Sequence, residues 1–393
     1  MFRLEKTQSF GSLEGALKSF LPNREKVIQI PGTLDRAGMF GIDAASCQFL
    51  LTLVEEQPDL ALRLSVGGLD SSAHLESLAR HLFGFAAICC FDKIVDAQSK
   101  PVSNTIIRGC IDGWVTRMDS GKLGEIIRGR SVTLACVSNG PREFIRPLYA
   151  LEENRGLQPC TAFQSFTRDM LSKCGASDVL TIREVDALGE LLFELFRNTD
   201  EHASLDERGN QKSEPRFRAI SASYREMQIT DTTGYFGGDL TLQSYIGKLV
   251  ASSKGAQKLK FFELSVVDNG PGLAARWIAD KGTKEGTSIV DVTIDEELNA
   301  VYECFEKYNT TKTDAGAGQG LTKVVNRLSS LNAFMRLRTG RLALYQTFSS
   351  KDIVTGKVAF RPVQINAQRA LKRATGTCYT ICIPLMVGDA NGR

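Results

Sequence analysis

Residues 261–272 read FFELSVVDNGPG, an apolar-rich run followed at once by an aspartate and two glycines. Four of the seven residues in the run 261–267 are aromatic or β-branched, which predicts a buried strand. Asp268 stands where that strand ends, and Gly270 and Gly272 follow it. Glycines at such a place let a ligand approach the backbone closely, beside a carboxylate that faces a cavity. Asn-Gly and Pro-Gly are also ordinary turn dipeptides, so a plain turn explains the same residues.

A helix is predicted upstream over residues 182–202, and Thr181 and Glu184 form a capping box at its start. Apolar residues recur at the helical period along one face. Glu194 and Asn198 lie one turn apart on an adjacent face. Asn offers Mg²⁺ a hard oxygen ligand, and Glu can orient or deprotonate a water. An ordinary amphipathic helix with a charged outer face accounts for the same stripe.

A glycine-rich stretch lies downstream, where residues 316–321 read GAGQGL and open a predicted helix over 321–331. Gly316, Gly318 and Gly320 would expose backbone N–H groups at a helix N-terminus, whose dipole favours anions such as phosphate. By itself, this glycine pattern is weak evidence for phosphate binding. It is not a Walker A loop, because no Gly-Lys-Ser/Thr follows, and no strand precedes it immediately as in a dinucleotide-binding fingerprint.

Taken in order, these motifs resemble the boxes of the GHKL ATPases, the superfamily of DNA gyrase B, a heat-shock chaperone, histidine kinases and MutL. The order is Glu194-x-x-x-Asn198, Asp268-x-Gly270-x-Gly272, a long segment, Gly316-x-Gly318-x-Gly320-Leu321, and Gly376-Thr377 entering a last strand. Residues 194–203 resemble the histidine-kinase form of the asparagine box, and residues 305–312 resemble the stretch before the glycines in sensor kinases. The resemblance covers about half the chain.

The resemblance implies a role for each matching residue. Asp268 would accept a hydrogen bond from the adenine amino group, and Asn198 would bind Mg²⁺ as well as the nucleotide. Glu194 matches the catalytic general base of the hydrolytic members. The remaining expected nucleotide-binding residues are Gly270, Gly272, Lys312, Gly316, Gly318, Gly320, Leu321 and Thr377. Among them, Lys312 is a candidate for the terminal phosphates, although a solvated lysine fits equally well.

The order of elements predicts an α+β fold, with helices first and hairpin strands last. The resemblance implies a two-layer α/β sandwich of Bergerat type over residues 179–386, with a mixed sheet and helices on one face. Residues 1–150 are expected to form a smaller α/β module that regulates it or binds a protein partner, and residues 151–178 to connect the two. Residues 1–22 are interpreted as a short leader.

Composition limits the kinds of partner and the cellular location that we expect for this protein. A net charge of +3 without a Lys/Arg block gives no sign of nucleic-acid binding. The longest apolar run, residues 82–91, is too short to span a bilayer, and the first residues lack a signal peptide. Ten cysteines without a CxxC indicate reduced thiols, and three histidines show no zinc-site spacing. We therefore expect a cytoplasmic protein away from membranes.

Three functions remain open. The first is a Mg²⁺-dependent ATPase or kinase-like switch that binds ATP, with residues 273–315 closing as a lid. The second is a protein kinase that acts in trans on a partner, and the third is an adenine-nucleotide sensor without turnover. The sequence departs from sensor kinases in a longer segment over 204–260 and in the lack of a phosphoacceptor pattern around His74 and His81. A homodimer is a further expectation, since the fold often works as one.

Overall fold

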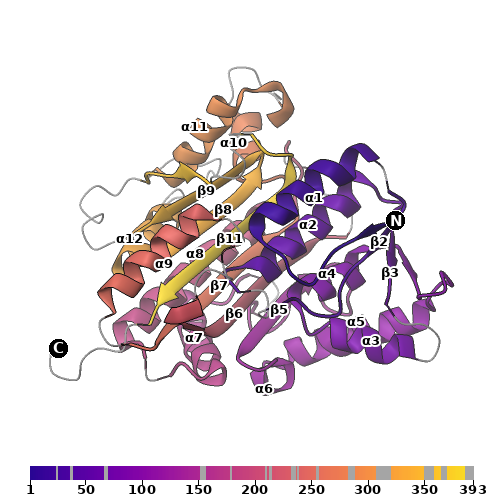
Figure 1. Ribbon diagram of the computed structural model, residues 1–393, viewed down its shortest axis with the longest axis horizontal. Helices are drawn as coiled ribbons and strands as arrows, with labels where there is room; N and C mark the ends of the chain where they lie inside the picture. Colours follow the sequence, from indigo (N-terminus) through magenta and orange to yellow (C-terminus); the bar gives the residue numbers. More distant parts are fainter. Residues whose placement is uncertain are drawn as a thin grey trace.

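The computed structural model describes residues 1–23, 25–35, 39–65, 70–150, 156–177, 179–208, 210–211, 215–231, 236, 239–253, 256–281, 288–306, 320–348, 358–363 and 370–385. These residues form two β-sheets with helices around them, so the predicted α+β class is confirmed. The larger sheet crosses the middle of the molecule, and the smaller sheet lies beside it near the N-terminus (Figure 1).

The larger sheet has seven strands in the order β10-β9-β8-β11-β7-β6-β5. Their bounds are β5 (Ser131–Val137), β6 (Phe217–Gln228), β7 (Lys258–Asp268), β8 (Phe334–Gly340), β9 (Leu342–Thr347), β10 (Arg361–Pro362) and β11 (Ala374–Pro384). Every neighbouring pair is antiparallel, which corrects the expected mixed sheet. Part of the reason is local: β8 turns into β9 at Gly340 (φ +52°), a connection too short for a parallel crossover.

Strand β5 ties the first 150 residues to this sheet. It lies within the segment expected to form a separate module, yet it pairs with β6 over its whole length, from Ser131 opposite Ser223 to Val137 opposite Phe217. Nearly every side chain of β5 is buried, on both faces of the sheet. A strand that is apolar on both faces needs cover on both sides, and a large layered sheet provides it.

The smaller sheet is parallel, in the order β1-β2-β3-β4. Its strands are β1 (Phe2–Arg3), β2 (Val27–Gln29), β3 (Ala61–Arg63) and β4 (Lys93–Val95). Residues 26–30 and 60–66 have the sequence pattern of strands, and β2 and β3 form within these ranges in shorter form. The leader interpretation is wrong, because the first residues form β1 and most of helix α1 (Phe10–Asn23), and the apolar side of α1 is buried in the main core.

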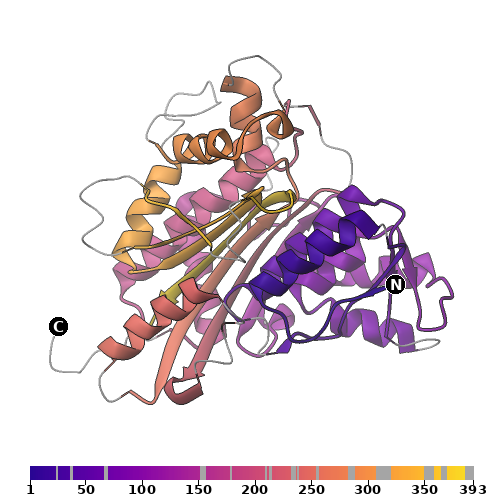
Figure 2. The same ribbon diagram turned by 45° about the horizontal axis from the view of Figure 1, so that its top comes forward.

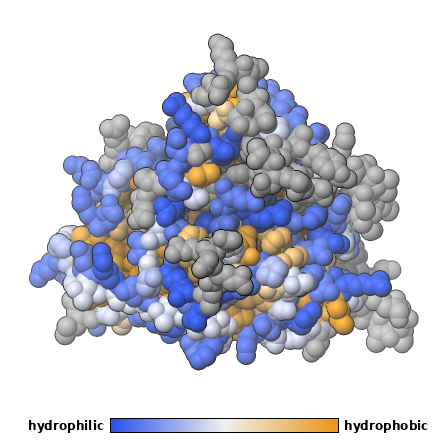
Figure 3. Space-filling view, turned by 180° about the vertical axis from the view of Figure 1, so that it is seen from behind, coloured by the Kyte–Doolittle hydropathy of each residue, from blue (hydrophilic) through white to orange (hydrophobic). Residues whose placement is uncertain are grey.

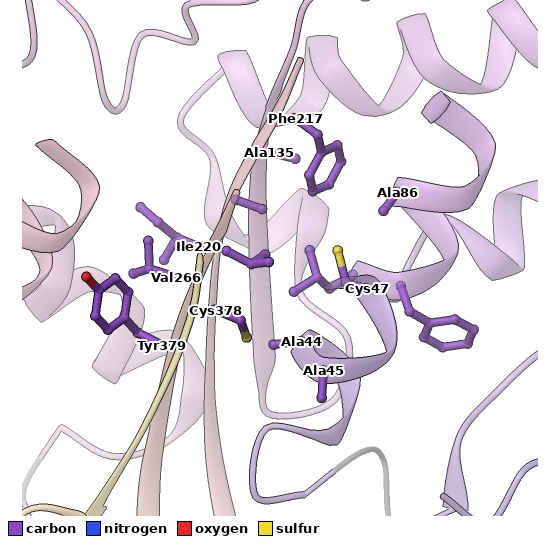
Figure 4. Close-up of a cluster of buried hydrophobic side chains, with 14 of the residues drawn as sticks. Ala44, Ala45, Cys47, Ala86, Ala135, Phe217, Ile220, Val266, Cys378 and Tyr379 are labelled. Atoms are coloured by element: carbon purple, nitrogen blue, oxygen red, sulfur yellow. The ribbon is translucent and has the colours of Figure 1, made fainter. Parts of the chain in front are cut away.

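Helices cover both faces of the large sheet, which corrects the expected two-layer arrangement. On one face lie α1, α2 (Ile42–Glu56) and α9 (Leu240–Ser252), and on the other lie α7 (Cys160–Cys174), α8 (Ile182–His202) and α12 (Gly320–Ser330) (Figures 1 and 2). Side chains alternate along β11, so Cys378 faces Cys47 of α2 while Tyr379 points to the opposite side (Figure 4). The alternation leaves both faces apolar, and each requires its own helical layer.

Residues 71–91 are apolar at the helical period, which predicts one helix, but the structure has two, α3 (Ser71–Leu78) and α4 (Leu82–Cys90). Asp43 of α2 causes part of the break, because its Oδ1 accepts the backbone N–H of Phe83 at 3.0 Å. In a continuous helix that N–H would bond the carbonyl four residues back. His81 stands at the break, buried, with Nε2 at 3.2 Å from Nη1 of Arg128.

The helix that carries Glu194 and Asn198 follows the sequence prediction closely. The predicted span 182–202 is α8, and its capping box forms: Thr181 Oγ1 accepts the N–H of Glu184, and a carboxylate oxygen of Glu184 accepts the N–H of Thr181. Such a cap satisfies two N–H groups that helix geometry leaves unpaired. The start and direction of α8 are therefore encoded locally.

The remaining helices complete the layers: α5 (Asn104–Asp119), α6 (Leu123–Ile126), α10 (Leu273–Lys281) and α11 (Ile294–Phe305). Within the described ranges, none of the helices has the length and apolarity needed to cross a bilayer. All ten cysteines are free thiols, eight of them buried. The face opposite to that of Figure 1 is mostly hydrophilic, with apolar residues in patches between polar ones (Figure 3).

Candidate functional site

Asp268 ends strand β7 in the middle of the large sheet, and it is only 6% exposed. Its Oδ1 accepts two backbone N–H groups, from Gly270 at 2.8 Å and from Thr377 at 3.3 Å. The first comes from the turn after β7, and the second comes from β11. Backbone N–H groups of this kind favour the charged carboxylate and fix its direction. The structure thus joins two predicted site residues, Asp268 and Thr377, through one carboxylate.

Two glycines allow this close arrangement. Gly376 has φ +61°, and a Cβ there would lie 1.8 Å from the carbonyl oxygen of Asp268. At Gly270, a Cβ would come within 2.7 Å of Cα of Ala203, the residue that ends helix α8. The backbone of Gly270 also bonds β11, since its carbonyl accepts the N–H of Gly376 at 2.7 Å. Both places therefore require glycine, on steric grounds that the sequence could not show.

Gly272 lies slightly further along, with φ +96°. Its Cβ position would be 3.0 Å from Oγ1 of Thr339 on β8, and that hydroxyl accepts the N–H of Leu273 at 2.8 Å. The same hydroxyl is 3.5 Å from Oγ1 of Thr377. The turn after β7 is thus bound to β8 as well as to β11, and the segment expected to act as a lid begins from a fixed point.

Glu194 lies in the middle of α8 and is only 3% exposed. Lys323 of α12 approaches its Oε1 at 3.2 Å, and Arg197, one turn along α8, pairs with Oε2. Both carboxylate oxygens therefore face a cation. The pairing holds α12 against α8, and a second ion pair between the same helices, Glu190 with Arg327, adds to it.

Asn198, one turn beyond Glu194, is half-buried. Its side-chain Nδ2 is enclosed and makes no hydrogen bond with any described residue. A buried polar group without a partner costs about 1–3 kcal/mol, so an amide left in this state is a candidate for ligand contact. Nδ2 is a donor, so it suits an acceptor such as a phosphate oxygen, and a Mg²⁺ ion would have to be held by the side-chain oxygen Oδ1. No group of three or more His, Cys, Asp and Glu residues able to hold a metal occurs in the described ranges.

The predicted phosphate-binding glycines lie mostly outside the described residues. Gly320 begins α12, and Leu321 follows it, buried at 7% exposure. Gly316, Gly318 and Lys312 fall outside the described residues. The start of α12 lies beside α8 through Lys323, three residues beyond Gly320. The structure therefore places α12, the helix that follows the glycine-rich stretch, against α8, near Glu194.

The expected lid, residues 273–315, is described over 273–281 and 288–306. It contains α10 and α11, and Val301, Tyr302 and Phe305, whose spacing in the sequence predicts a short helix, lie on α11. Tyr302 is anchored, because its hydroxyl donates to the carbonyl of Phe360 at 2.8 Å. This part of the segment is packed structure, and residues 307–315 lie outside the described residues.

Tyr379 is not among the residues predicted from the sequence, and it lies two residues beyond Thr377 and therefore, by strand alternation, on the same side of β11. It is 1% exposed, and its hydroxyl has no hydrogen-bond partner among the described residues. Burial raises the pKa of this phenol well above its usual value, and the charge of Asp268 adds to the effect. The hydroxyl is thus a protonated, unsatisfied donor close to Asp268, and the alternation of β11 is the only signal in the sequence that could have indicated it.

A buried ion network supports the end of α8. Arg218 of β6 is 2% exposed and donates to Asp200 at 2.5 Å and to Glu143 at 3.1 Å. Tyr149 donates to the same oxygen of Asp200 at 2.5 Å. Removing one partner of such a network leaves an uncompensated buried charge, so α8 is held firmly two residues beyond Asn198.

A surface hollow of about 720 Å³ lies elsewhere, lined by Glu25, Lys26, Glu56, Gln57, Pro58, Asp59, Leu60 and Lys93. None of the predicted site residues lines it. Its walls come from the ends of α2 and of the small parallel sheet, and they carry both acidic and basic side chains. Asp268, Thr377, Glu194 and the start of α12 therefore constitute the candidate site on grounds of chemistry, whereas the hollow offers volume without a matching set of groups.

The chain was compared with protein-family models, with curated proteins and with solved structures, and none of the three comparisons found a match.

Proposed function

We propose that residues 179–386 bind ATP with Mg²⁺, in the manner of the GHKL ATPases that the motif order resembles, and that the protein is a nucleotide-dependent switch. The observation that carries the proposal is the convergence at Asp268. Its carboxylate is oriented by Gly270 and Thr377, and Gly270 in turn abuts the end of the helix that bears Glu194 and Asn198. The turn after Asp268 thus contacts the Gly376-Thr377 segment and the C-terminal end of α8.

Asp268 is proposed as the group that selects adenine. An ionised carboxylate only accepts hydrogen bonds, so it suits the amino group of adenine and not the carbonyl of guanine. The unsatisfied hydroxyl of Tyr379 adds a donor near the same place. Asn198 would hold Mg²⁺, which supplies charge neutralisation for the phosphates when it is bound. The start of α12 would receive phosphate oxygens at its N-terminal N–H groups.

The surroundings of Glu194 favour a switch with slow turnover over an efficient hydrolase. A general base must contact the attacking water, and Arg197 and Lys323 already occupy both carboxylate oxygens of Glu194, so a water would first have to displace one of these cations. One of these two ion pairs, Glu194 with Lys323, connects α8 to α12, the helix that would sense the phosphates. We infer that Glu194 chiefly positions α12 and that chemistry at this residue is slow.

Purified protein incubated with γ-labelled ATP and Mg²⁺, alone and with cell extract, tests the proposal. We expect nucleotide binding and slow release of labelled phosphate. A labelled second protein would indicate a kinase acting in trans, and binding without either product would indicate a sensor. Rapid turnover would contradict the positioning role of Glu194. Failure to bind ATP or its analogues by calorimetry would overturn the proposal as a whole.

A further inference from the structure

Helix α2 of the N-terminal part is hydrogen-bonded to the residue that precedes Gly376. Gln48 donates from Nε2 to the carbonyl of Thr375 at 3.0 Å and to the carbonyl of Arg338 at 3.1 Å. Thr52, one turn further along α2, accepts the backbone N–H of Thr375 on its Oγ1 at 3.0 Å. Both backbone groups of Thr375 are thus bonded to side chains of α2, in place of a neighbouring strand.

The side chain of Thr375 is also held by α2. Its Oγ1 donates to Oε2 of Glu55 at 2.7 Å, and the carbonyl oxygens of Asn269 and Gly270 lie at 3.3 Å from the same hydroxyl. Thr375 therefore connects α2 with the turn after Asp268. Three side chains of one helix, at positions 48, 52 and 55, converge on it at the spacing of successive helical turns.

The contacts of Gln48 and Thr52 are polar and buried, which distinguishes them from ordinary packing of a helix on a sheet, whereas Glu55 is an exposed residue that bonds the hydroxyl of Thr375. Gln48 is 2% exposed, Thr52 is 1% exposed and Thr375 is 5% exposed. Nearby, α2 packs on the sheet through small apolar groups, with Ala44 and Cys47 against Cys378 (Figure 4). These apolar contacts alone would be enough to pack α2 on the sheet. Buried hydrogen bonds in addition fix the helix and the chain at Thr375 in one register.

The register of Thr375 decides the geometry at Asp268. The pairing of β11 with β8 is irregular between Ala374 and Thr377, so the bulge has no regular ladder to hold it. Gly376 bonds Gly270 within this bulge, and the N–H of Thr377 bonds Asp268. A displacement of Thr375 would therefore move both backbone groups that orient the carboxylate.

We propose that Gln48, Thr52 and Glu55 are positioning residues of the nucleotide site, through which the N-terminal part of the chain sets nucleotide affinity. A partner that shifts α2 would loosen the bulge at Thr375 and weaken adenine binding. Because coupling between two sites is reciprocal, bound nucleotide would in turn stabilise α2. This inference rests on the proposed function, since it concerns the regulation of that same site.

The variant Thr52→Val tests the inference, because it keeps the shape of the side chain and removes the acceptor for Thr375. We expect affinity for an ATP analogue and for adenosine to fall by the same factor, on the order of ten-fold, while affinity for tripolyphosphate is unchanged. Thr52→Ser should restore affinity. The matched control is Thr167→Val on α7, a fully buried threonine whose hydroxyl has no partner among the described residues.

A measurement on the unaltered protein complements the variants. Hydrogen exchange of the α2 amides should slow when the ATP analogue is added, and exchange in α5, which carries none of these contacts, should not. If the unaltered protein binds no adenine nucleotide, the proposed function fails and the inference with it. If it binds, and a folded Thr52→Val binds equally well, or α2 shows no added protection, the inference alone is overturned.

Discussion

Replacement of Asp268 by Asn separates ligand recognition from folding. Asn has nearly the same shape, and its side-chain oxygen can still accept the N–H groups of Gly270 and Thr377, at 2.8 Å and 3.3 Å in the unaltered protein. The fold around β7 and β11 should therefore survive. What changes is the second side-chain atom, which becomes an NH₂ donor in place of a carboxylate oxygen.

The size of the effect follows from burial and charge. Asp268 is 6% exposed, so bulk water does not replace a lost bond there. A charge-assisted hydrogen bond contributes about 1.5–3 kcal/mol, and about 1.4 kcal/mol corresponds to ten-fold in affinity. We expect Asp268→Asn to bind an ATP analogue about ten- to hundred-fold more weakly. Adenosine should lose the same factor, because the change concerns the base and not the phosphates.

Calorimetry with adenosine and with an ATP analogue measures the loss, and urea unfolding checks that the variant is folded. Asp59→Asn is the matched control, since the Asp59 side chain is fully exposed and outside the candidate site. Unchanged affinity in a folded Asp268→Asn protein would refute the role proposed for this carboxylate. A guanine nucleotide that binds the variant better than the unaltered protein would strengthen it.

Glu194→Gln should retain nucleotide binding, and labelled phosphate release then decides its role: a loss of about 10²–10⁴-fold would mark a general base, whereas the structure predicts a much smaller loss. Asn198→Ala should weaken Mg²⁺-dependent binding of the ATP analogue and spare adenosine, and equal losses for both ligands would contradict metal binding at Asn198. Burial, with the charge of Arg128, lowers the pKa of His81 to about 3, below its ordinary value of 6.5. The stability contributed by neutral His81 is complete above pH 6.5 and is lost as the pH falls toward 3, so between pH 6.5 and 5 the unaltered protein should lose about 2 kcal/mol more than His81→Gln. Urea unfolding curves that shift in parallel for the two proteins would show that His81 is not responsible.

Several elements could be predicted because their causes are local. The capping box of Thr181 and Glu184 and the apolar period behind it define α8 within a few residues of chain. The aromatic and β-branched run before Asp268 defines β7, and a helix does begin at Gly320. In these cases the interacting groups are neighbours in the sequence, so the local sequence pattern is enough to predict the element.

Other features depend on residues that meet only in the folded chain. The partner of Glu194 is Lys323, 129 residues away, and the acceptor for the N–H of Thr375 is Thr52, 323 residues away. Periodicity shows that such side chains lie on a helix, but it cannot show which charge or hydroxyl will face them. The break between α3 and α4 has the same origin, because Asp43 reaches it from another helix.

Local patterns in the sequence were enough to predict the α+β class, the helix that bears Glu194 and Asn198, and the strand that ends at Asp268. The antiparallel order of the large sheet, the addition of β5 to it, and the helices on both of its faces became evident in the folded chain alone. A strand with apolar side chains on both faces must be covered on both sides, but its own residues do not specify which elements will cover it. That choice is made by packing across the whole chain, and the same packing brings α2 to Thr375.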